Sequence, residues 1–503
     1  MAKRKRESDQ SDRKEVEEQP RKAVKSDVEA APSTGAGSLT IQVVTGSYER
    51  VLHGFTATLP AKPSLVKGSK SDNSKESSVQ FADTFLFQAH RSAIRALAVS
   101  PLTEADSAQP QKLILASGGT DERVNLYSLS AAPPVVDERF PSVPTLAGNK
   151  ILENPGNREL GSLLHHSSTI TKLYFPTKSK LLAASEDNTI SVVRTRDWTV
   201  VSTIKAPRPK PHGRPSGDTA PPGQGPAGVN DFAVHPSMKL MISVGRGEKC
   251  MRLWNLVTGK KAGALNFSKD LLQSVKEGRH GTGEGRAIVW NSEGEEFAVA
   301  FEWGVAVFGV DSVAKCRAVT SRPTKVHRIR YVTFRSEGKK HEFLAVSTED
   351  GRVLFYSTQS PRKSKDTDPE SSIPDAELYA QVGGKAGGVS GRVKDFEILS
   401  LASNEAWKDH YLLVTCGSDG VVRLWLLRAE DFRAASKPES SDSQGETRQI
   451  GTLLDTYETG DRITCMVAFV MQQPREPSVD EELEFESEAG VDDESSSDDE
   501  DSD

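Results

Sequence analysis

Three glycines, Gly223, Gly225 and Gly228, form the GxGxxG spacing that can cradle a dinucleotide phosphate. They follow a proline-rich stretch and not a predicted strand, so dinucleotide binding is not expected. The sequence has no Walker-A, HExxH or GxSxG motif, its ten histidines show no metal-ligand spacing, and its four cysteines include no CxxC pair. We therefore predict a protein that is not an enzyme, with no cofactor, no metal and no small-molecule substrate.

A different pattern recurs: an acidic residue in a small-residue turn is followed six residues later by an aromatic residue or its aliphatic replacement, as Asp121 is by Tyr127. Such a carboxylate can accept hydrogen bonds from the turn and from a histidine in the loop before the repeat. His90 and His166 stand four residues before predicted strands, where that structural histidine belongs. The pattern predicts seven structural turn acids: Glu49, Asp121, Asp187, Glu248, Glu302, Asp350 and Asp419.

Short antiparallel strands are needed to position these turns. Runs such as IRALAVSP and VKDFEI alternate apolar and polar residues, and repeats of ~40–45 residues with four such strands are typical of a β-propeller. The N-terminal repeat has three strand-like runs but no first strand, and RITCMVAF near the C-terminus can supply it. We predict an all-β, seven-bladed WD-repeat β-propeller over residues 39–474, closed by that strand. Where Glu replaces Asp, at Glu49, Glu248 and Glu302, less regular blades are expected.

Both ends of the chain are polar and highly charged. Residues 1–38 mix both charge signs, and residues 475–503 carry fifteen acidic side chains and one arginine. Neither segment has enough apolar side chains to form a core, so both are predicted to be disordered tails. A candidate nuclear-localisation patch comprises Lys3, Arg4, Lys5 and Arg6, and the candidate phosphorylation sites for an acidophilic kinase are Ser495, Ser496 and Ser497. A chance basic terminus and a merely solubilising tail are the alternatives.

The net charge of −7 hides an uneven distribution. The acidic tail carries −14, which leaves +7 on the rest of the chain, a balance that suits a nucleic-acid or ribonucleoprotein setting. If the loops between blades share a face with the acidic turns, a cluster of basic residues lies on the rim of that face. This cluster can contact the phosphates of RNA, or it can bind a protein partner. An ordinary solvated surface is the alternative. The cluster comprises Lys205, Arg208, Lys210, Arg214, Arg246, Lys249, Arg286, Arg322, Lys325 and Arg328.

No window of the sequence approaches the ~18 apolar residues that a membrane span needs, and the N-terminal MAKRKRESDQ has no apolar run behind its charges. The chain is therefore expected to be soluble and intracellular, with no membrane partner.

Several runs, in order along the chain, resemble the PAK-interacting protein / maintenance-of-killer WD-repeat family. They include VVTGSYERVLHGF, HHSSTITKLYF, VNDFAVHPSMKLMISVG and MRLWNLVTGKKA, and the resemblance covers roughly residues 40–470. Members of that family are nucleolar factors that assemble the large ribosomal subunit. The resemblance implies a scaffold in the nucleus and nucleolus that holds pre-60S assembly factors, ribosomal proteins or pre-ribosomal RNA.

Animal members of the family were also described as negative regulators of PAK kinases, so direct docking on such a kinase is the alternative function. The charge distribution favours ribosome assembly, because a basic patch has no evident use in kinase docking. On that basis, reversing Arg322, Lys325 and Arg328 to Glu is expected to weaken association with the particle and to leave the fold intact.

Overall fold

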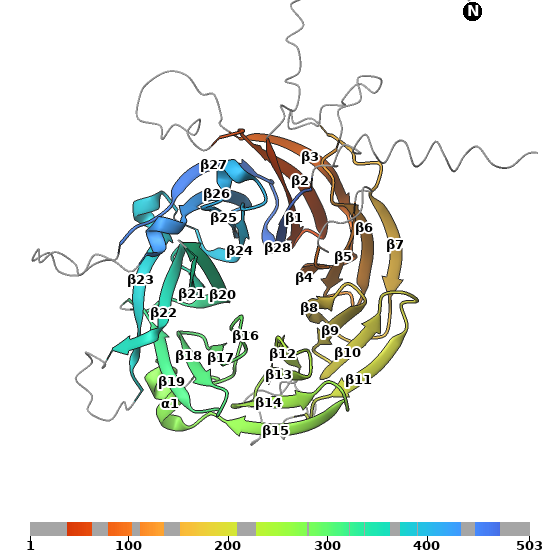
Figure 1. Ribbon diagram of the computed structural model, residues 1–503. Coiled ribbons are helices and arrows are strands. Elements are labelled where there is room, and N and C mark those ends of the chain that lie inside the picture. Colours follow the sequence, from red (N-terminus) through yellow and green to blue (C-terminus); the bar gives the residue numbers. More distant parts are fainter. Residues whose placement is uncertain are drawn as a thin grey trace, which may run out of the picture. The chain divides into compact units, whose positions relative to one another are not determined.

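A computed structural model describes residues 38–62, 79–102, 111–134, 151–208, 228–278, 281–320, 322–336, 338–362, 373–389, 391–433 and 448–472. Almost all regular structure in these ranges is β-strand, and the described strands form antiparallel groups of four around a common centre (Figure 1). Both tails predicted from the sequence, apart from Ser38, lie outside the described residues, as do the basic patch at Lys3–Arg6 and the serines at 495–497. None of the described helices is long and apolar enough to cross a bilayer.

Each group of four strands is called a unit here, and its first strand is the innermost. Unit 1 contains β28 (Ile463–Val470), β1 (Leu39–Ser47), β2 (Val51–Leu59) and β3 (Gln80–Gln88). Unit 2 contains β4 (Ile94–Val99), β5 (Lys112–Gly119), β6 (Val124–Ser130) and β7 (Arg158–Leu163). Unit 3 contains β8 (Ile170–Thr177), β9 (Lys180–Ser185), β10 (Thr189–Arg194) and β11 (Val200–Lys205).

The remaining strands follow the same order. Unit 4 contains β12 (Val229–Val234), β13 (Leu240–Gly245), β14 (Cys250–Asn255) and β15 (Lys260–Asn266). Unit 5 contains β16 (Ala287–Trp290), β17 (Glu296–Ala300), β18 (Gly304–Gly309) and β19 (Ala314–Val319). Unit 6 contains β20 (Val326–Ser336), β21 (Lys339–Thr348), β22 (Arg352–Arg362) and β23 (Asp375–Gly383). Unit 7 contains β24 (Val393–Ser400), β25 (His410–Gly417), β26 (Val421–Arg428) and β27 (Thr452–Glu458).

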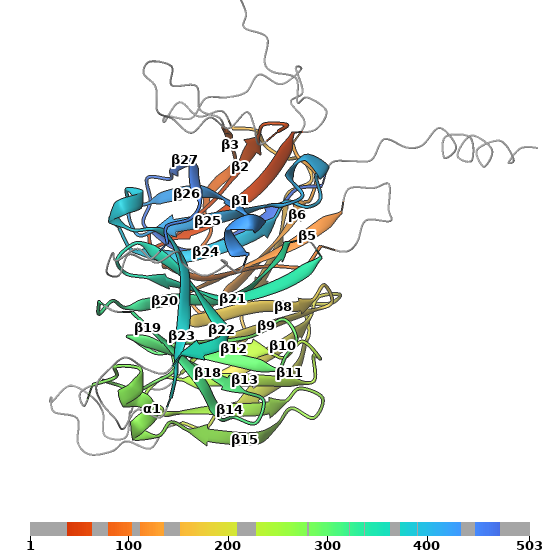
Figure 2. The same cartoon turned by 60° about the vertical axis from the view of Figure 1, so that its left-hand side comes forward.

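Units 5 and 6 are linked into one eight-stranded sheet by a single parallel residue pair, Arg317 with Asp375. The first strands contact one another in cyclic order, from β28 through β4, β8, β12, β16, β20 and β24 back to β28. Figure 2 shows the same units turned by 60°, stacked side by side. The strand content and the repeats confirm the all-β WD-repeat fold that the sequence predicts.

The two ends of the described chain meet in unit 1. β28 pairs antiparallel with β1, from Ile41 opposite Val470 to Ser47 opposite Ile463. This pairing confirms the expectation that RITCMVAF completes the N-terminal group of strands. Pairing both edges of β1 also removes the open edge that it would otherwise present to other chains.

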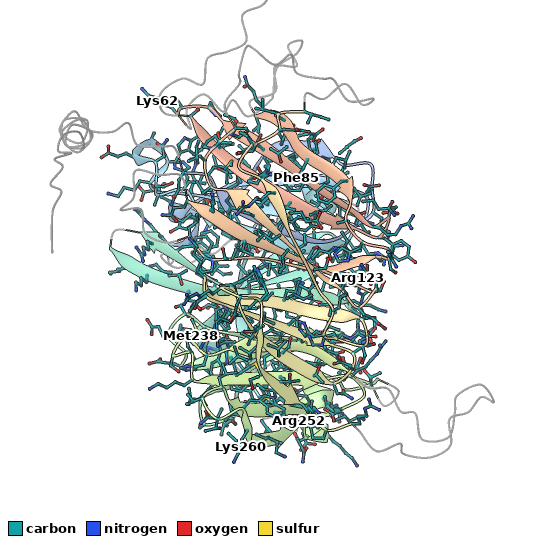
Figure 3. All side chains as sticks on the ribbon, turned by 90° about the vertical axis from the view of Figure 1, so that its right-hand side faces the viewer. Lys62, Phe85, Arg123, Met238, Arg252 and Lys260 are labelled. Atoms are coloured by element: carbon teal, nitrogen blue, oxygen red, sulfur yellow. The ribbon has the colours of Figure 1, made fainter. Side chains whose placement is uncertain are left out.

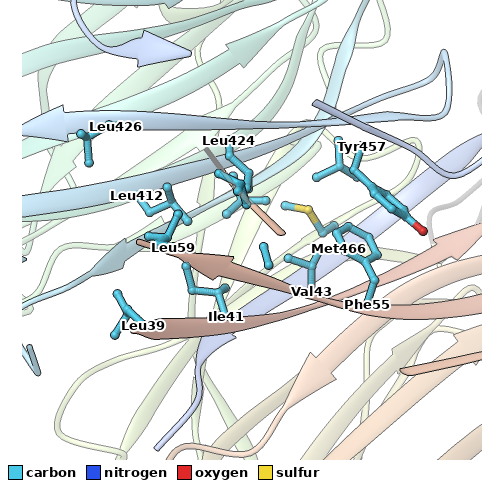
Figure 4. Close-up of a cluster of buried hydrophobic side chains, with 14 of the residues drawn as sticks. Leu39, Ile41, Val43, Phe55, Leu59, Leu412, Leu424, Leu426, Tyr457 and Met466 are labelled. Atoms are coloured by element: carbon cyan, nitrogen blue, oxygen red, sulfur yellow. The ribbon is translucent and has the colours of Figure 1, made fainter. Parts of the chain in front are cut away.

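The hydrophobic core lies between neighbouring units. Figure 4 shows one such layer, in which Ile41, Val43 and Phe55 of unit 1 approach Leu424 and Tyr457 of unit 7. The residues that follow the turn acids by six positions all lie in layers of this kind and are buried: Phe55, Tyr127, Val193, Trp254, Phe308, Tyr356 and Trp425. Burying a side chain of this size contributes roughly 1.5–3 kcal/mol, so the recurring spacing reflects packing between units.

Helices are confined to connections. A short α1 (Lys269–Ser274) joins units 4 and 5, and its first turn is capped by the Ser268 hydroxyl, which accepts a hydrogen bond from the Leu271 N–H. Leu271 and Leu272 pack into the layer between those units. This helix could not be predicted from the sequence because it is too short to show a helical period. The 3₁₀ turns of the described residues are η2 (Lys385–Gly387), η3 (Glu405–Trp407) and η4 (Ala429–Phe432).

Candidate partner-binding face and central channel

One face of the ring collects two kinds of connection. Because the strands of each unit are antiparallel, the turn between the second and third strands lies at the same end as the connection to the next unit. We call this end the turn face. In Figure 3, Arg123 in the turn between β5 and β6 and Met238 in the turn between β12 and β13 lie on opposite sides of the ring, which separates the turn face from the opposite face.

Two turn acids are held by histidines. Asp121 Oδ1 lies 3.0 Å from His90 Nδ1, and the Arg91 N–H donates to the same carboxylate at 2.9 Å. Asp187 Oδ2 lies 3.1 Å from His166 Nδ1 and accepts the Ser167 N–H at 3.2 Å. Each carboxylate therefore ties its turn to the loop that enters the same unit.

These contacts shift the titration of the Asp121–His90 pair. Burial opposes ionisation of Asp121, but hydrogen bonds from the Arg91 N–H and His90 overcome it and lower the pKa of Asp121. Burial lowers the pKa of His90 more than Asp121 raises it. His90 is therefore neutral at pH 7, so the pair acts as a hydrogen bond between an imidazole and a carboxylate.

The other five turn acids have no histidine partner among the described residues. Four of them pair with cationic side chains: Glu248 with Arg252, Glu302 with Arg286 and Lys325, Asp350 with Arg352, and Asp419 with Arg423. Glu49 instead accepts the Arg462 N–H at 2.9 Å, which links β1 to the start of β28. The longer Glu side chains reach these partners, and the strand pairs that flank the turns at Glu49, Glu248 and Glu302 keep an unbroken register. The irregularity expected from the sequence is therefore not seen at these turns.

Five of the seven turns share one backbone conformation. The residue after the acid adopts a left-handed conformation in five turns, with φ of 65–85°. The residues concerned are Arg50, Glu122, Asn188, Gly351 and Gly420. At Gly420 an added Cβ would lie 2.7 Å from the Asp461 carbonyl oxygen, so only glycine fits that position without movement.

The structure corrects part of the basic cluster predicted on the rim of this face. Arg246 pairs with Glu186 at 3.0 Å, and Arg286 and Lys325 share Glu302 at 3.0 and 2.9 Å. Their charge is thus partly neutralised by acids of adjacent turns. Four of the predicted residues are exposed and form no ion pair with described residues: Lys205, Arg208, Lys249 and Arg322. Lys210 and Arg214 lie outside the described residues.

Arg328 is a further correction, because it lies inside the ring and not on its rim. Its Nε is 3.4 Å from Asp395 Oδ1, and it lines the central channel beside the first strands of the units. The nearby Asp395 raises the pKa of Arg328, so its charge is fixed. Reversing Arg328 to Glu would place two carboxylates together in the channel, so the triple reversal expected to leave the fold intact would damage it.

The central channel holds a layer of charged side chains that was not predicted from the sequence. Lys172 Nζ lies 2.9 Å from Asp231 Oδ1, and Arg330 Nη2 lies 2.6 Å from Glu397 Oε1. The channel encloses about 480 Å³ and is lined by residues of all seven first strands. Burial raises the pKa of Glu397 to about 6, partly offset by Arg330.

Two aspartates of this layer also join neighbouring units. Asp231 of β12 accepts the Ile288 N–H of β16 at 3.1 Å, and Asp395 of β24 accepts the Met466 N–H of β28 at 3.4 Å. Both belong to a shared local sequence, VNDF and VKDF, that starts its first strand. The repeated Asp-Phe sequence is the feature from which the shared role of Asp231 and Asp395 could have been predicted.

Groups suited to metal or thiol chemistry are not assembled in the described ranges. No three His, Cys, Asp or Glu side chains there are grouped to hold a metal ion. The four cysteines are free thiols, and burial raises the pKa of Cys316 and Cys465 to about 12, which disfavours the reactive thiolate. Gly228 directly precedes β12, whereas Gly223 and Gly225 lie outside the described residues.

Two segments of the chain match a known protein family, and several known proteins are similar to most of its length. Residues 157–193 and 393–425 match the WD domain, G-beta repeat family. The chain is 24% identical over 87% of its length to a Danio rerio p21-activated protein kinase-interacting protein 1-like, covering 82% of that protein. It is 25% identical over 84% of its length to Protein MAK11 of Saccharomyces cerevisiae, covering 82% of that protein.

A third relative, Shk1 kinase-binding protein 15 of Schizosaccharomyces pombe, is 22% identical over 87% of this chain, which covers 86% of that protein. These matches cover more than four fifths of the chain and so extend well beyond the two WD segments. They confirm that the chain is a WD-repeat protein that resembles the PAK-interacting protein / maintenance-of-killer proteins along most of its length.

Proposed function

We propose that this protein is a non-catalytic scaffold in the biogenesis of the large (60S) ribosomal subunit, acting in the nucleolus. The observation that carries the proposal is the similarity to MAK11, which extends over more than four fifths of both chains.

The architecture supports a binding role. Charged groups in the channel are engaged in pairs that join first strands, and the turn acids are engaged in local hydrogen bonds and ion pairs. These groups therefore stabilise the ring, while the exposed side chains of the turn face are available to partners. Assembly factors and ribosomal proteins are the proposed partners, and pre-ribosomal RNA can add contacts to exposed cations such as Lys249 and Arg322.

Docking on a PAK-type kinase is the second candidate function. The names of the zebrafish and fission-yeast relatives, kinase-interacting and kinase-binding, favour it directly. A regulator of this kind would use the same rigid face to cover a kinase surface, and it would not need to enter a ribosomal precursor.

Sedimentation separates the two functions. We expect tagged full-length protein from nuclear extract to run on a sucrose gradient with large-subunit precursors, and to move to the top after treatment that dissociates those particles. Large-subunit precursor RNA and kinase are measured in the same fractions. Protein that runs only in light fractions, or that follows the kinase and not precursor RNA, would reject the ribosomal function.

A further inference from the structure

Four cationic side chains gather where the central channel opens on the turn face. Arg95 and Lys394 are the second residues of β4 and β24, while Arg392 and Arg462 immediately precede β24 and β28. These three first strands are neighbours in the ring. We call Arg95, Arg392, Lys394 and Arg462 the mouth cluster.

Few acids balance the mouth cluster. Arg392 approaches Glu349 at 3.7 Å, and the guanidinium of Arg462 lies over the Tyr48 ring at 5.6 Å from its centre. Arg95, Lys394 and Arg462 form no ion pair with any described carboxylate. Burial, followed by the charges of Arg392, Arg462 and Arg95, lowers the pKa of Lys394, as expected where like charges are held together.

The layer beneath cannot supply the missing negative charge. Its three acids, Asp231, Asp395 and Glu397, already pair with Lys172, Arg328 and Arg330 within the channel. The channel layer is therefore close to neutral, while the mouth cluster keeps an excess of positive charge. Like charges held together repel one another, and a bound anion relieves that repulsion.

The shape and surroundings of the mouth decide which anion fits. The mouth cluster lies at the starts of β4, β24 and β28, before the channel-lining residues Ala96, Asp395 and Met466 of the same strands. Two exposed acids that form no ion pair with described residues stand on the turns around it, Glu49 and Glu122. An RNA strand lying across the face would bring its phosphates close to those carboxylates. A short acidic peptide that inserts its side chains into the mouth stays away from those carboxylates.

His327, the second residue of β20, adds a polar atom beside the mouth cluster. Its Nε2 is buried and has no hydrogen-bond partner among the described residues. Burial and then the charges of Lys394 and Arg392 lower the pKa of His327 to about 4, so its ring is neutral at pH 7. A neutral imidazole can bond to a peptide group without adding further repulsion.

We propose that the mouth cluster binds an acidic segment of a partner protein, with Asp or Glu side chains entering the channel mouth between β4, β24 and β28. This inference goes beyond the proposed function, since it holds for any partner that carries such a segment.

The test uses full-length protein and two labelled probes, a twelve-residue Glu/Asp peptide and a twelve-nucleotide single-stranded RNA, followed by fluorescence anisotropy. The test variant is Arg95→Glu with Lys394→Glu. The matched control is Lys180→Glu with Lys239→Glu, which makes the same charge change at exposed sites on the opposite face. Comparing the two separates a local site from a general effect of net charge.

We expect peptide affinity to fall about tenfold or more in the mouth variant and to stay within about twofold in the control. If the double reversal lowers the melting temperature, Arg95→Gln with Lys394→Gln replaces it, with a smaller loss expected in the same direction. Equal peptide affinity in mouth and control variants would overturn the proposal. So would mouth-dependent binding of the RNA that is tighter than that of the peptide.

Discussion

Ending the chain after Arg462, which removes β28, is expected to abolish cooperative folding of the ring. β28 pairs with β1 along its length and buries Ile463, Met466, Val467 and Phe469. Four such side chains contribute roughly 6–12 kcal/mol as an upper bound, at about 1.5–3 kcal/mol each. That range is comparable with the whole free energy of unfolding of a typical domain, about 5–15 kcal/mol.

The control ends after Gln472 and so keeps β28 while removing the acidic C-terminal segment. Thermal unfolding by circular dichroism, with gel filtration of the same samples, compares the two. The shorter chain should show no sharp transition and should aggregate, because the edge of β1 is then open. A shared, sharp transition in both chains would show that the terminal strand does not close the ring.

The second large effect is expected at Asp395. This carboxylate faces the guanidinium groups of Arg328 and Arg330 at 3.4 and 3.7 Å, and accepts the N–H groups of Phe396 and Met466. Asp395→Ala leaves Arg328 in the channel without a carboxylate partner. Breaking a buried ion pair in this way costs about 3–5 kcal/mol, so the midpoint of urea unfolding should fall strongly.

Two comparisons isolate the cause of that loss. Asp395→Ala combined with Arg328→Met removes the uncompensated charge and should recover part of the stability. Glu377→Ala, which breaks the exposed pair with Arg362 on unit 6, should cost no more than about 1 kcal/mol. Equal losses at Asp395 and Glu377, or no recovery in the double variant, would contradict the role assigned to the channel layer.

Features that depend on neighbouring residues could be predicted from the sequence. The spacing between Asp121 and Tyr127 depends only on one pair of adjacent strands. The same spacing therefore recurs in every repeat, and this recurrence predicts the fold. The pairing of the two chain ends could also be predicted, because the N-terminal repeat lacks a first strand and RITCMVAF is a strand without a repeat of its own. Both signals are local patterns repeated along the chain.

Features that depend on contacts between units could not be predicted. Arg328 belongs to a basic run in the sequence, yet its partner Asp395 lies 67 positions away on the next unit. In the same way, Glu302 neutralises both Arg286 and Lys325, which come from connections on either side of unit 5. Such ion pairs determine the charge of a surface. The sum of basic residues in the sequence therefore overestimated the positive charge on the rim of the turn face.

We propose that the turn face is the surface through which this protein joins a large-subunit precursor. Lysine crosslinking and mass spectrometry on particles purified through the tagged chain tests it most directly. Exposed lysines of the turn face, Lys249, Lys269 and Lys385, should crosslink to assembly factors or large-subunit proteins, whereas Lys180, Lys239 and Lys260 of the opposite face should not. Crosslinks confined to the opposite-face lysines, or none to any large-subunit component, would show that the turn face is not the binding surface.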